Sequence, residues 1–212
     1  MRLVQIFFRL ACIGCIACFV LGALSGTVRS AFLLVCTRTI ARISPPDYAF
    51  VGDSLTRDCR WLGRVTWNPI RGVNLAVGGS VIRQIAAQVG EAEKLGAKHV
   101  LIAAGINDLI LDHAPKERIE FDFDLLLRGL GRNQHAIVTL IPYTSDAAYS
   151  SRIDATNELI KSLAGHRSLT VLDMNSYLSS NGTRKPEMTN DGVHFSDQAC
   201  AIWSREIRKN LN

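Results

Sequence analysis

The chain has 212 residues and a formal net charge of +5, from 24 basic and 19 acidic side chains. This length predicts one domain of ordinary size and leaves no room for a second once a targeting segment is set apart. The excess positive charge lies in residues 1–46, which hold five arginines and no acidic residue, whereas residues 47–212 are neutral. With no basic stripe in the domain, we predict no nucleic-acid partner.

The first feature in chain order is an uncharged, strongly apolar segment of 19 residues between Arg9 and Arg29. At about 1.5 Å per residue, a helix of this length can cross the hydrocarbon core of a bilayer. We therefore predict that residues 1–46 form an N-terminal membrane anchor and a linker, and that the domain occupies residues 47–212. The linker ends at Pro45-Pro46, which interrupts any helix that arrives from the anchor.

A cleaved signal peptide is the alternative to a retained anchor, because the small residues over 21–26 offer a cleavage point. The orientation of the anchor stays open, because Arg2 and Arg9 on one side nearly balance Arg29, Arg38 and Arg42 on the other.

Five of the six cysteines fall into two settings. Cys12, Cys15 and Cys18 repeat at intervals of three, but their apolar surroundings favour small residues of a membrane helix over metal ligands. Cys59 and Cys200 belong to the domain and could pair if it is exported, although the sequence does not show whether their Cα atoms are close enough.

From Tyr48 onward, short apolar runs alternate with longer amphipathic segments. The runs predict strands over 48–51, 72–77, 99–104, 136–141 and 169–172. The clearest helices are predicted over 81–95, 121–130 and 147–164, with a last helix that Ser196 caps and that ends near Lys209. This alternation predicts an α/β fold, a three-layer α/β/α sandwich around a five-stranded parallel sheet.

Four short motifs carry polar groups suited to catalysis: Gly52-Asp53-Ser54-Leu55, residues 74–79, Gly105-Ile106-Asn107-Asp108 and Asp191-Gly192-Val193-His194. The first three follow the first three predicted strands. Because the carboxyl ends of parallel strands meet at one edge of a sheet, we expect Ser54, Gly79 and Asn107 to converge there. Leu55-Thr56 follows Ser54, so the G-x-S-x-G turn of the α/β-hydrolases is absent.

These motifs, in this order, resemble the SGNH, or GDSL, hydrolase family, and the resemblance runs from about Tyr48 to the C-terminus. It implies a flavodoxin-like sheet, ester hydrolysis, and no metal or other cofactor. It also implies a domain outside the cytoplasm, since relatives with such a leader usually act there.

Each catalytic role has a candidate. Ser54 is the predicted nucleophile, His194 the base that takes its proton, and Asp191 the acid that orients the imidazole. The predicted oxyanion hole consists of the N–H groups of Ser54 and Gly79 and the side-chain amide of Asn107. The resemblance selects Gly79 over the adjacent glycine by its offset from residue 74.

The other polar residues near these motifs have simpler interpretations. Asp53 and Asp108 are predicted to accept hydrogen bonds from loop amides, and the remaining histidines show no metal-ligand spacing: His99, His113, His135 and His166.

We therefore predict a serine esterase that cleaves an acyl ester, with short acyl groups such as acetyl favoured. Its substrate would be a small-molecule, lipid or carbohydrate ester, and its contact with a membrane would be the N-terminal helix. The alternatives are an O-acyltransferase or deacetylase acting on an envelope carbohydrate, and a catalytically silent binding protein with the same fold.

Overall fold

The computed structural model describes residues 45–59, 72–167 and 169–211. The predicted membrane-spanning segment and its cysteines lie outside these ranges. No helix within the described ranges is long and apolar enough to cross a bilayer. Residues from Pro46 onward form one compact unit, and the catalytic motifs all belong to it.

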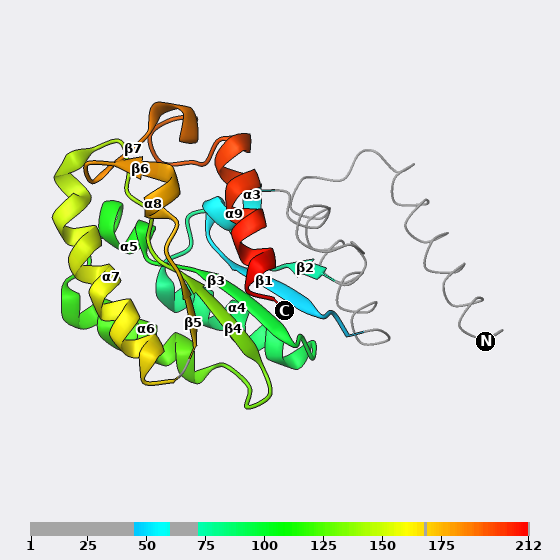
Figure 1. The fold of residues 1–212 in the computed structure, drawn as a ribbon. Coiled ribbons are helices and arrows are strands. Elements are labelled where there is room, and N and C mark those ends of the chain that lie inside the picture. Colours follow the sequence, from blue (N-terminus) through cyan, green and yellow to red (C-terminus); the bar gives the residue numbers. More distant parts are fainter. Residues whose placement is uncertain (1–44, 60–71, 168, 212) are drawn as a thin grey trace, which may run out of the picture. The chain divides into compact units, whose positions relative to one another are not determined.

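A parallel sheet of five strands runs through this unit in the order β2-β1-β3-β4-β5 (Figure 1). The strands are β1 (Tyr48–Gly52), β2 (Gly72–Asn74), β3 (His99–Ala103), β4 (His135–Thr139) and β5 (Thr170–Leu172). The three central strands are buried along most of their length, which explains why their sequences are continuous apolar runs without alternation.

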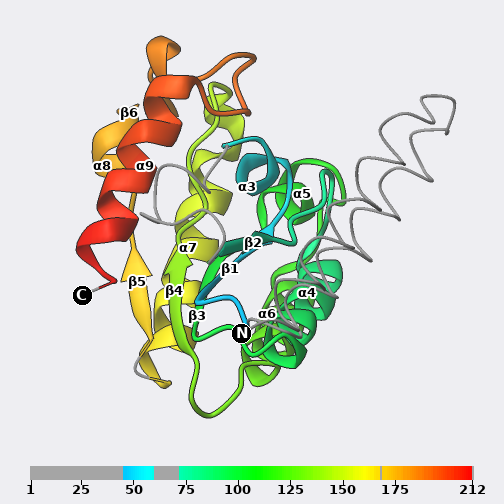
Figure 2. The ribbon, with the colours of Figure 1, turned by 90° about the vertical axis from the view of Figure 1, so that its right-hand side faces the viewer.

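Helices cover both faces of the sheet (Figure 2). One face carries α4 (Ile82–Lys94), α6 (Lys116–Arg128) and α7 (Ser150–Gly165), and the other carries α9 (Asp197–Lys209). The shorter elements are α3 (Ser54–Asp58), α5 (Ile106–Ile110), η3 (Ala147–Tyr149), α8 (Asn175–Leu178), β6 (Ser179–Ser180), β7 (Thr183–Arg184) and η4 (Pro186–Met188). The predicted three-layer α/β/α fold with five parallel strands is therefore confirmed.

The core joins α9 to the sheet through Trp203. Its indole Nε1 donates to Thr139 Oγ1 on β4 over 3.0 Å, and its ring meets Phe195 edge-on, with centroids 5.2 Å apart. Because Phe195 directly follows His194, this packing fixes the end of the catalytic loop against the sheet.

Three of the differences between predicted and observed element boundaries have an identifiable cause. β2 ends at Asn74 because its side-chain Oδ1 accepts the N–H of Ala76 and turns the chain out of the sheet. α6 begins five residues earlier than predicted, directly after Pro115, which has the extended backbone of an N-cap. The segment from Ala147 starts as a 3₁₀ turn capped by Asp146 before α7 follows. The last helix agrees with its prediction, since Ser196 caps α9 and Lys209 ends it.

Cys59 and Cys200, whose pairing the sequence left open, form a disulfide with Cα atoms 5.3 Å apart. Cys59 caps the carboxyl end of α3, and Cys200 lies in the first turns of α9. The bond therefore joins the helix that follows Ser54 to the helix that follows His194.

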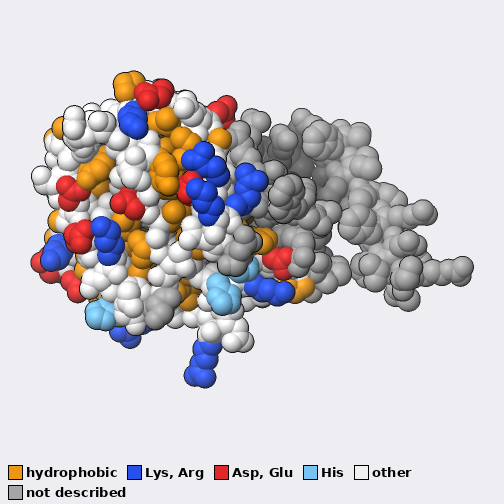
Figure 3. Space-filling model, in the orientation of Figure 1, with side chains coloured by type: hydrophobic (Ala, Val, Ile, Leu, Met, Phe, Trp, Pro, Cys, Tyr) orange, Lys and Arg blue, Asp and Glu red, His pale blue; other side chains and the backbone are white. Residues whose placement is uncertain are grey.

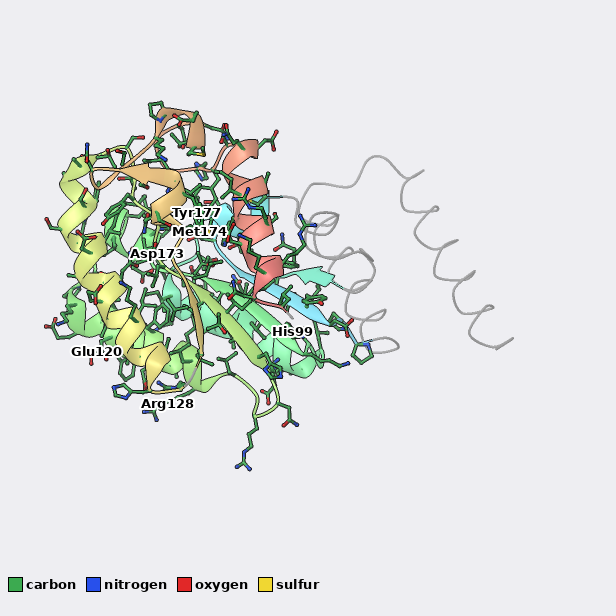
Figure 4. The ribbon with its side chains drawn as sticks, viewed as in Figure 1. His99, Glu120, Arg128, Asp173, Met174 and Tyr177 are labelled. Carbon is green, nitrogen blue, oxygen red and sulfur yellow. A yellow bond between two sulfur atoms is a disulfide. The ribbon has the colours of Figure 1, made fainter. Side chains whose placement is uncertain are left out.

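The described surface carries both signs of charge. On the face shown in Figure 3, basic and acidic side chains lie among uncharged and hydrophobic ones. His99 lies at the amino end of β3, where its ring stacks between those of Tyr48 and His135 (Figure 4). This cluster is at the edge of the sheet opposite to the catalytic motifs.

Candidate active site

Ser54 is placed by a tight turn between β1 and α3. Asp53 caps the helix, its Oδ1 accepting the N–H of Leu55 over 2.9 Å, so Ser54 becomes the first helical residue. Gly52 allows the turn because a Cβ there would lie 2.2 Å from Thr56 Oγ1 and 2.8 Å from the carbonyl oxygen of Ala103. The sequence thus directs one hydroxyl to the carboxyl end of the sheet.

The loop that precedes α9 brings His194 to this hydroxyl. His194 Nε2 lies 2.9 Å from Ser54 Oγ, and His194 Nδ1 lies 2.6 Å from Asp191 Oδ2. One ring nitrogen therefore faces a hydroxyl while the other faces a carboxylate, which is the arrangement that a general base needs. The structure brings these three residues together as predicted from the sequence.

The carboxylate of Asp191 also orders its own loop. Its Oδ1 accepts the N–H groups of His194 over 2.7 Å and Val193 over 3.0 Å. The hydrogen bond from the His194 ring, followed by these two backbone bonds, lowers the pKa of Asp191 to about 2. Asp191 therefore stays ionised at neutral pH and can stabilise a positively charged imidazole.

Gly79 and Asn107, the predicted oxyanion donors, lie on neighbouring segments at the same edge of the sheet. Gly79 has φ +76°, a backbone conformation that side chains other than glycine rarely adopt. Asn107 is 5% exposed, and its Nδ2 donates to the carbonyl oxygen of Ser80 over 3.0 Å, which fixes the amide plane. Within the described part of the chain, the N–H groups of Ser54 and Gly79 and the second amide hydrogen of Asn107 have no acceptor.

Asp53 and Asp108 both bind backbone amides, as the sequence predicts. Asp108 Oδ2 accepts the N–H of Ile82 over 3.0 Å at the start of α4. Burial raises the pKa of Asp53 to about 7, against the opposing hydrogen bond from Leu55, and burial also raises the pKa of Asp108. Because the pKa of Asp53 is near 7, the charge of this carboxyl group beside Ser54 should change around neutral pH.

Two buried polar residues that hold the site were not predicted from the sequence. Gln88 on α4 hydrogen-bonds to Gly52, and Arg184 on β7 donates from Nη1 to the carbonyl oxygen of Val193 over 3.4 Å. Gln88 interrupts the apolar face of α4, a signal that helical periodicity could have shown, whereas no sequence pattern marks Arg184.

Arg184 is a charged residue buried behind the catalytic loop. It is 3% exposed, and its guanidinium carbon lies 4.6 Å from the centre of the Phe195 ring. Desolvation lowers the pKa of Arg184 to about 10, while the charge of Asp191 acts in the opposite direction. The side chain remains a cation at neutral pH and supports the loop that carries Asp191 and His194.

A cleft of about 520 Å³ lies beside the segment that carries Asp191. Its lining combines the apolar Ile110 and Leu111, which follow Asn107, with polar side chains: Thr144, Ser145, Asp146 and Tyr149. A lining of this kind offers a ligand both apolar contacts and hydrogen-bond partners. Among the described residues there is no group of three or more His, Cys, Asp or Glu side chains arranged to hold a metal ion.

Residues 50–202 match the GDSL-like lipase/acylhydrolase family. The match covers most of the domain, so the chain belongs to this family and is an enzyme that acts on ester bonds.

Solved structures with the same fold include three enzymes at low sequence identity. A GDSL-like lipase from Bacteroides thetaiotaomicron has a TM-score of 0.66 and 18% identity, with 81% of this chain and 93% of that chain covered. The lipase/acylhydrolase from Enterococcus faecalis has a TM-score of 0.66 and 17% identity, covering 78% and 95%. An acetyl xylan esterase from Geobacillus stearothermophilus has a TM-score of 0.61 and 18% identity, covering 78% and 94%.

The chain is also similar to curated proteins named N-acylneuraminate cytidylyltransferase from Streptococcus agalactiae. The serotype V protein is 25% identical over 129 residues, which cover 59% of this chain and 31% of that protein. The chain therefore matches about a third of the length of these curated relatives.

Proposed function

We propose that this enzyme is a serine esterase with Ser54 as nucleophile, His194 as general base and Asp191 as the orienting acid. The observation that carries the proposal is the continuous hydrogen-bonded series from Ser54 Oγ through both ring nitrogens of His194 to the Asp191 carboxylate. A serine hydroxyl is a weak nucleophile by itself, and a base at 2.9 Å supplies the missing activation.

The reaction proceeds in two halves. His194 Nε2 takes the proton of Ser54 as Oγ attacks the ester carbonyl, and Asp191 stabilises the imidazolium that forms. The developing oxyanion accepts hydrogen bonds from the N–H groups of Ser54 and Gly79 and from the side-chain amide of Asn107. The imidazolium then gives its proton to the departing alcohol, leaving an acyl group on Ser54. Water, activated by the same imidazole, releases the acid and restores the hydroxyl.

The proposed substrates are esters of short acyl groups, with acetyl favoured. Among the described residues, one residue separates β1 from α3 and two separate β3 from α5, so these two connections leave little chain to enclose a long acyl group. The fold shared with an acetyl xylan esterase is compatible with this choice.

A carbohydrate ester is the second candidate substrate, which a deacetylase or an O-acyltransferase would use. It is favoured by the polar part of the cleft, where Thr144, Ser145, Asp146 and Tyr149 offer partners for sugar hydroxyls. The curated relatives, which this chain matches in part, are named for a sugar, N-acylneuraminate. Acyl transfer would use the same catalytic residues and differ only in the group that attacks the acyl-enzyme.

The test of the mechanism compares the domain from Ser44 onward with its Ser54→Ala variant, using p-nitrophenyl esters of increasing acyl length. The proposal expects hydrolysis that is fastest for acetyl and that the variant loses. Full hydrolysis by Ser54→Ala would refute the mechanism, whereas a maximum at long acyl chains would refute only the substrate. Sugar acetates, assayed with and without an acceptor sugar, separate hydrolysis from transfer.

We further propose that the domain acts outside the cytoplasm, held by the N-terminal anchor or released from a cleaved leader. The disulfide between Cys59 and Cys200 supports an oxidising compartment. Alkaline phosphatase and green fluorescent protein fused in turn to the C-terminus of the full chain test the location. Phosphatase activity without fluorescence is expected, and the reverse pattern would contradict the proposal.

A further inference from the structure

Gln88 lies on the buried face of α4, where its neighbours one turn away are apolar. The side chain is 9% exposed, while Ile85 and Ala92 are fully buried. A buried amide is costly unless its oxygen and nitrogen both find partners. The partners of Gln88 all belong to segments that carry the proposed oxyanion hole.

Gly52, two residues before Ser54, forms hydrogen bonds with both the oxygen and the nitrogen of the Gln88 amide. The N–H of Gly52 donates to Gln88 Oε1 over 2.7 Å, and Gln88 Nε2 donates to the carbonyl oxygen of Gly52 over 3.0 Å. The last register pair of β1 with β2 is Phe50 with Asn74, so Gly52 extends beyond the end of β2. The carbonyl oxygen of Gly52 also accepts the N–H of Val77, in the segment after β2, over 3.1 Å. Gln88 Oε1 therefore supplies the acceptor that a longer β2 would have offered to the Gly52 N–H, and Gln88 Nε2 adds a second donor to the carbonyl oxygen.

Ser80 links Gln88 to the other donors. Gln88 Nε2 also lies 3.5 Å from Ser80 Oγ, a long contact, and the carbonyl oxygen of Ser80 accepts Asn107 Nδ2 over 3.0 Å. Ser80 directly follows Gly79. One amide on α4 thus contacts the segment leading to Ser54 and the residue that both adjoins Gly79 and orients Asn107.

We propose that Gln88 is a positioning residue that holds the three oxyanion donors in register. It acts through Gly52 and Ser80 and does not touch the substrate. The inference rests on the proposed function, because it concerns the oxyanion hole of that same site. Oxyanion donors accelerate a reaction only when they are already in place as the charge develops. Because the three donors come from separate segments, a buried side chain that joins those segments preserves their spacing.

The main experiment uses Gln88→Met, which keeps the length of the side chain and removes its hydrogen bonds. The matched control is Gln84→Met on the same helix, at an exposed position whose Oε1 accepts the N–H of Val81. Each protein is assayed on p-nitrophenyl acetate, and its working sites are counted by titration with a fluorophosphonate, so that turnover is expressed per active molecule.

The expected result for Gln88→Met is a fall in kcat per titrated site of about 10- to 100-fold, the scale of a small misplacement of catalytic groups. KM should change little, and the inhibition constant of a boronic acid that forms a tetrahedral adduct with Ser54 should rise in parallel. Gln84→Met should match the wild type. A Gln88→Met variant with fewer titratable sites but normal turnover at each would show a structural role alone and overturn the inference.

A second variant, Gln88→Glu, provides the rescue. A protonated carboxyl group keeps an acceptor for the Gly52 N–H and an O–H donor for the Gly52 carbonyl oxygen. The Gln88→Glu variant should therefore have a higher kcat per titrated site than Gln88→Met at the lowest pH values at which the enzyme is active. A Gln88→Glu variant no better than Gln88→Met at any pH would contradict the inference.

Failure of this inference is distinguishable from failure of the proposed function. If Ser54 is not the nucleophile, the wild-type protein itself shows no labelling at Ser54. If only the role of Gln88 is wrong, the wild type is labelled at Ser54, and the wild type and Gln88→Met have the same turnover per labelled site.

Discussion

His194 Nε2 lies within hydrogen-bond distance of Ser54 Oγ, at 2.9 Å, although 140 positions separate the two residues in the chain. Two features hold this contact. The Asp191 carboxylate orders the loop from one side, and the disulfide joins the helices that follow the two catalytic residues. Each feature leads to a measurable consequence.

Replacing Asp191 by Asn should lower kcat by about 10²- to 10⁴-fold, because an amide no longer stabilises the imidazolium and can favour the wrong tautomer. KM should stay close to that of the wild type. The pKa of Asp191 near 2 means that this carboxylate is ionised throughout the usual assay range. A loss of wild-type activity between pH 4 and 7 should therefore reflect the titration of a group other than Asp191. Steady-state kinetics across pH check both points, and a fully active Asp191→Asn enzyme would exclude the assigned role.

Replacing Asn107 by Ala should reduce kcat by about 10²- to 10³-fold, the usual effect of removing one oxyanion donor. Asn133→Ala, an exposed change in the turn before β4, is the matched control and should behave as the wild type. Thermal unfolding of both variants shows whether the fold persists. A folded Asn107→Ala protein with undiminished kcat would show that this amide does not bind the oxyanion.

Asp53 should make stability depend on pH. Burial raises its pKa from the ordinary value of 3.8 to about 7, so the folded state holds a proton that the unfolded state has already lost. The contribution of Asp53 to the free energy of unfolding should then be largest below about pH 4 and decline as pH rises towards 7. Asp53→Asn keeps the cap on Leu55 and should flatten this decline. Denaturant titrations at several pH values test it, and equal pH slopes in both proteins would contradict the assignment.

The disulfide closes a loop of 141 residues, so its loss should destabilise the fold by about 2–5 kcal/mol. In the absence of reductant, the double variant Cys59→Ser/Cys200→Ser should unfold at a lower denaturant concentration than the wild type. Reductant should have no effect on the double variant. Since the bond joins the helices after Ser54 and His194, turnover should also fall while the variant is still folded. Identical unfolding midpoints with and without the bond would show that it contributes nothing to stability.

Much of the fold was predictable because its signals are local. The buried strands are continuous apolar runs. The glycine-containing turns at the ends of β1 and β3 indicate where Ser54 and Asn107 lie. Ser196 identifies the start of α9 by its hydroxyl, which accepts the N–H of Ala199. Boundaries were less accurate where one side chain decides them, as Asn74 does at the end of β2.

The parts of the site that escaped prediction depend on contacts between separate elements. Gln88 contacts Gly52 across 36 positions, and Arg184, in the hairpin of β6 and β7, contacts Val193 of the catalytic loop nine positions further along the chain. No periodic pattern in the sequence indicates which residue either side chain contacts. The disulfide belongs to the same class, since nothing near Cys59 indicates that Cys200 lies beside it.

Trapping the acyl-enzyme tests the central claim most directly. The wild-type domain is mixed with p-nitrophenyl acetate, quenched in acid within the first turnover, digested and examined by mass spectrometry. The account predicts an acetyl group on Ser54, absent from Ser54→Ala and also detected, at a slower rate of formation, in Asn107→Ala. Hydrolysis that continues with no acyl group on Ser54, or with the acyl group on another residue, would contradict it.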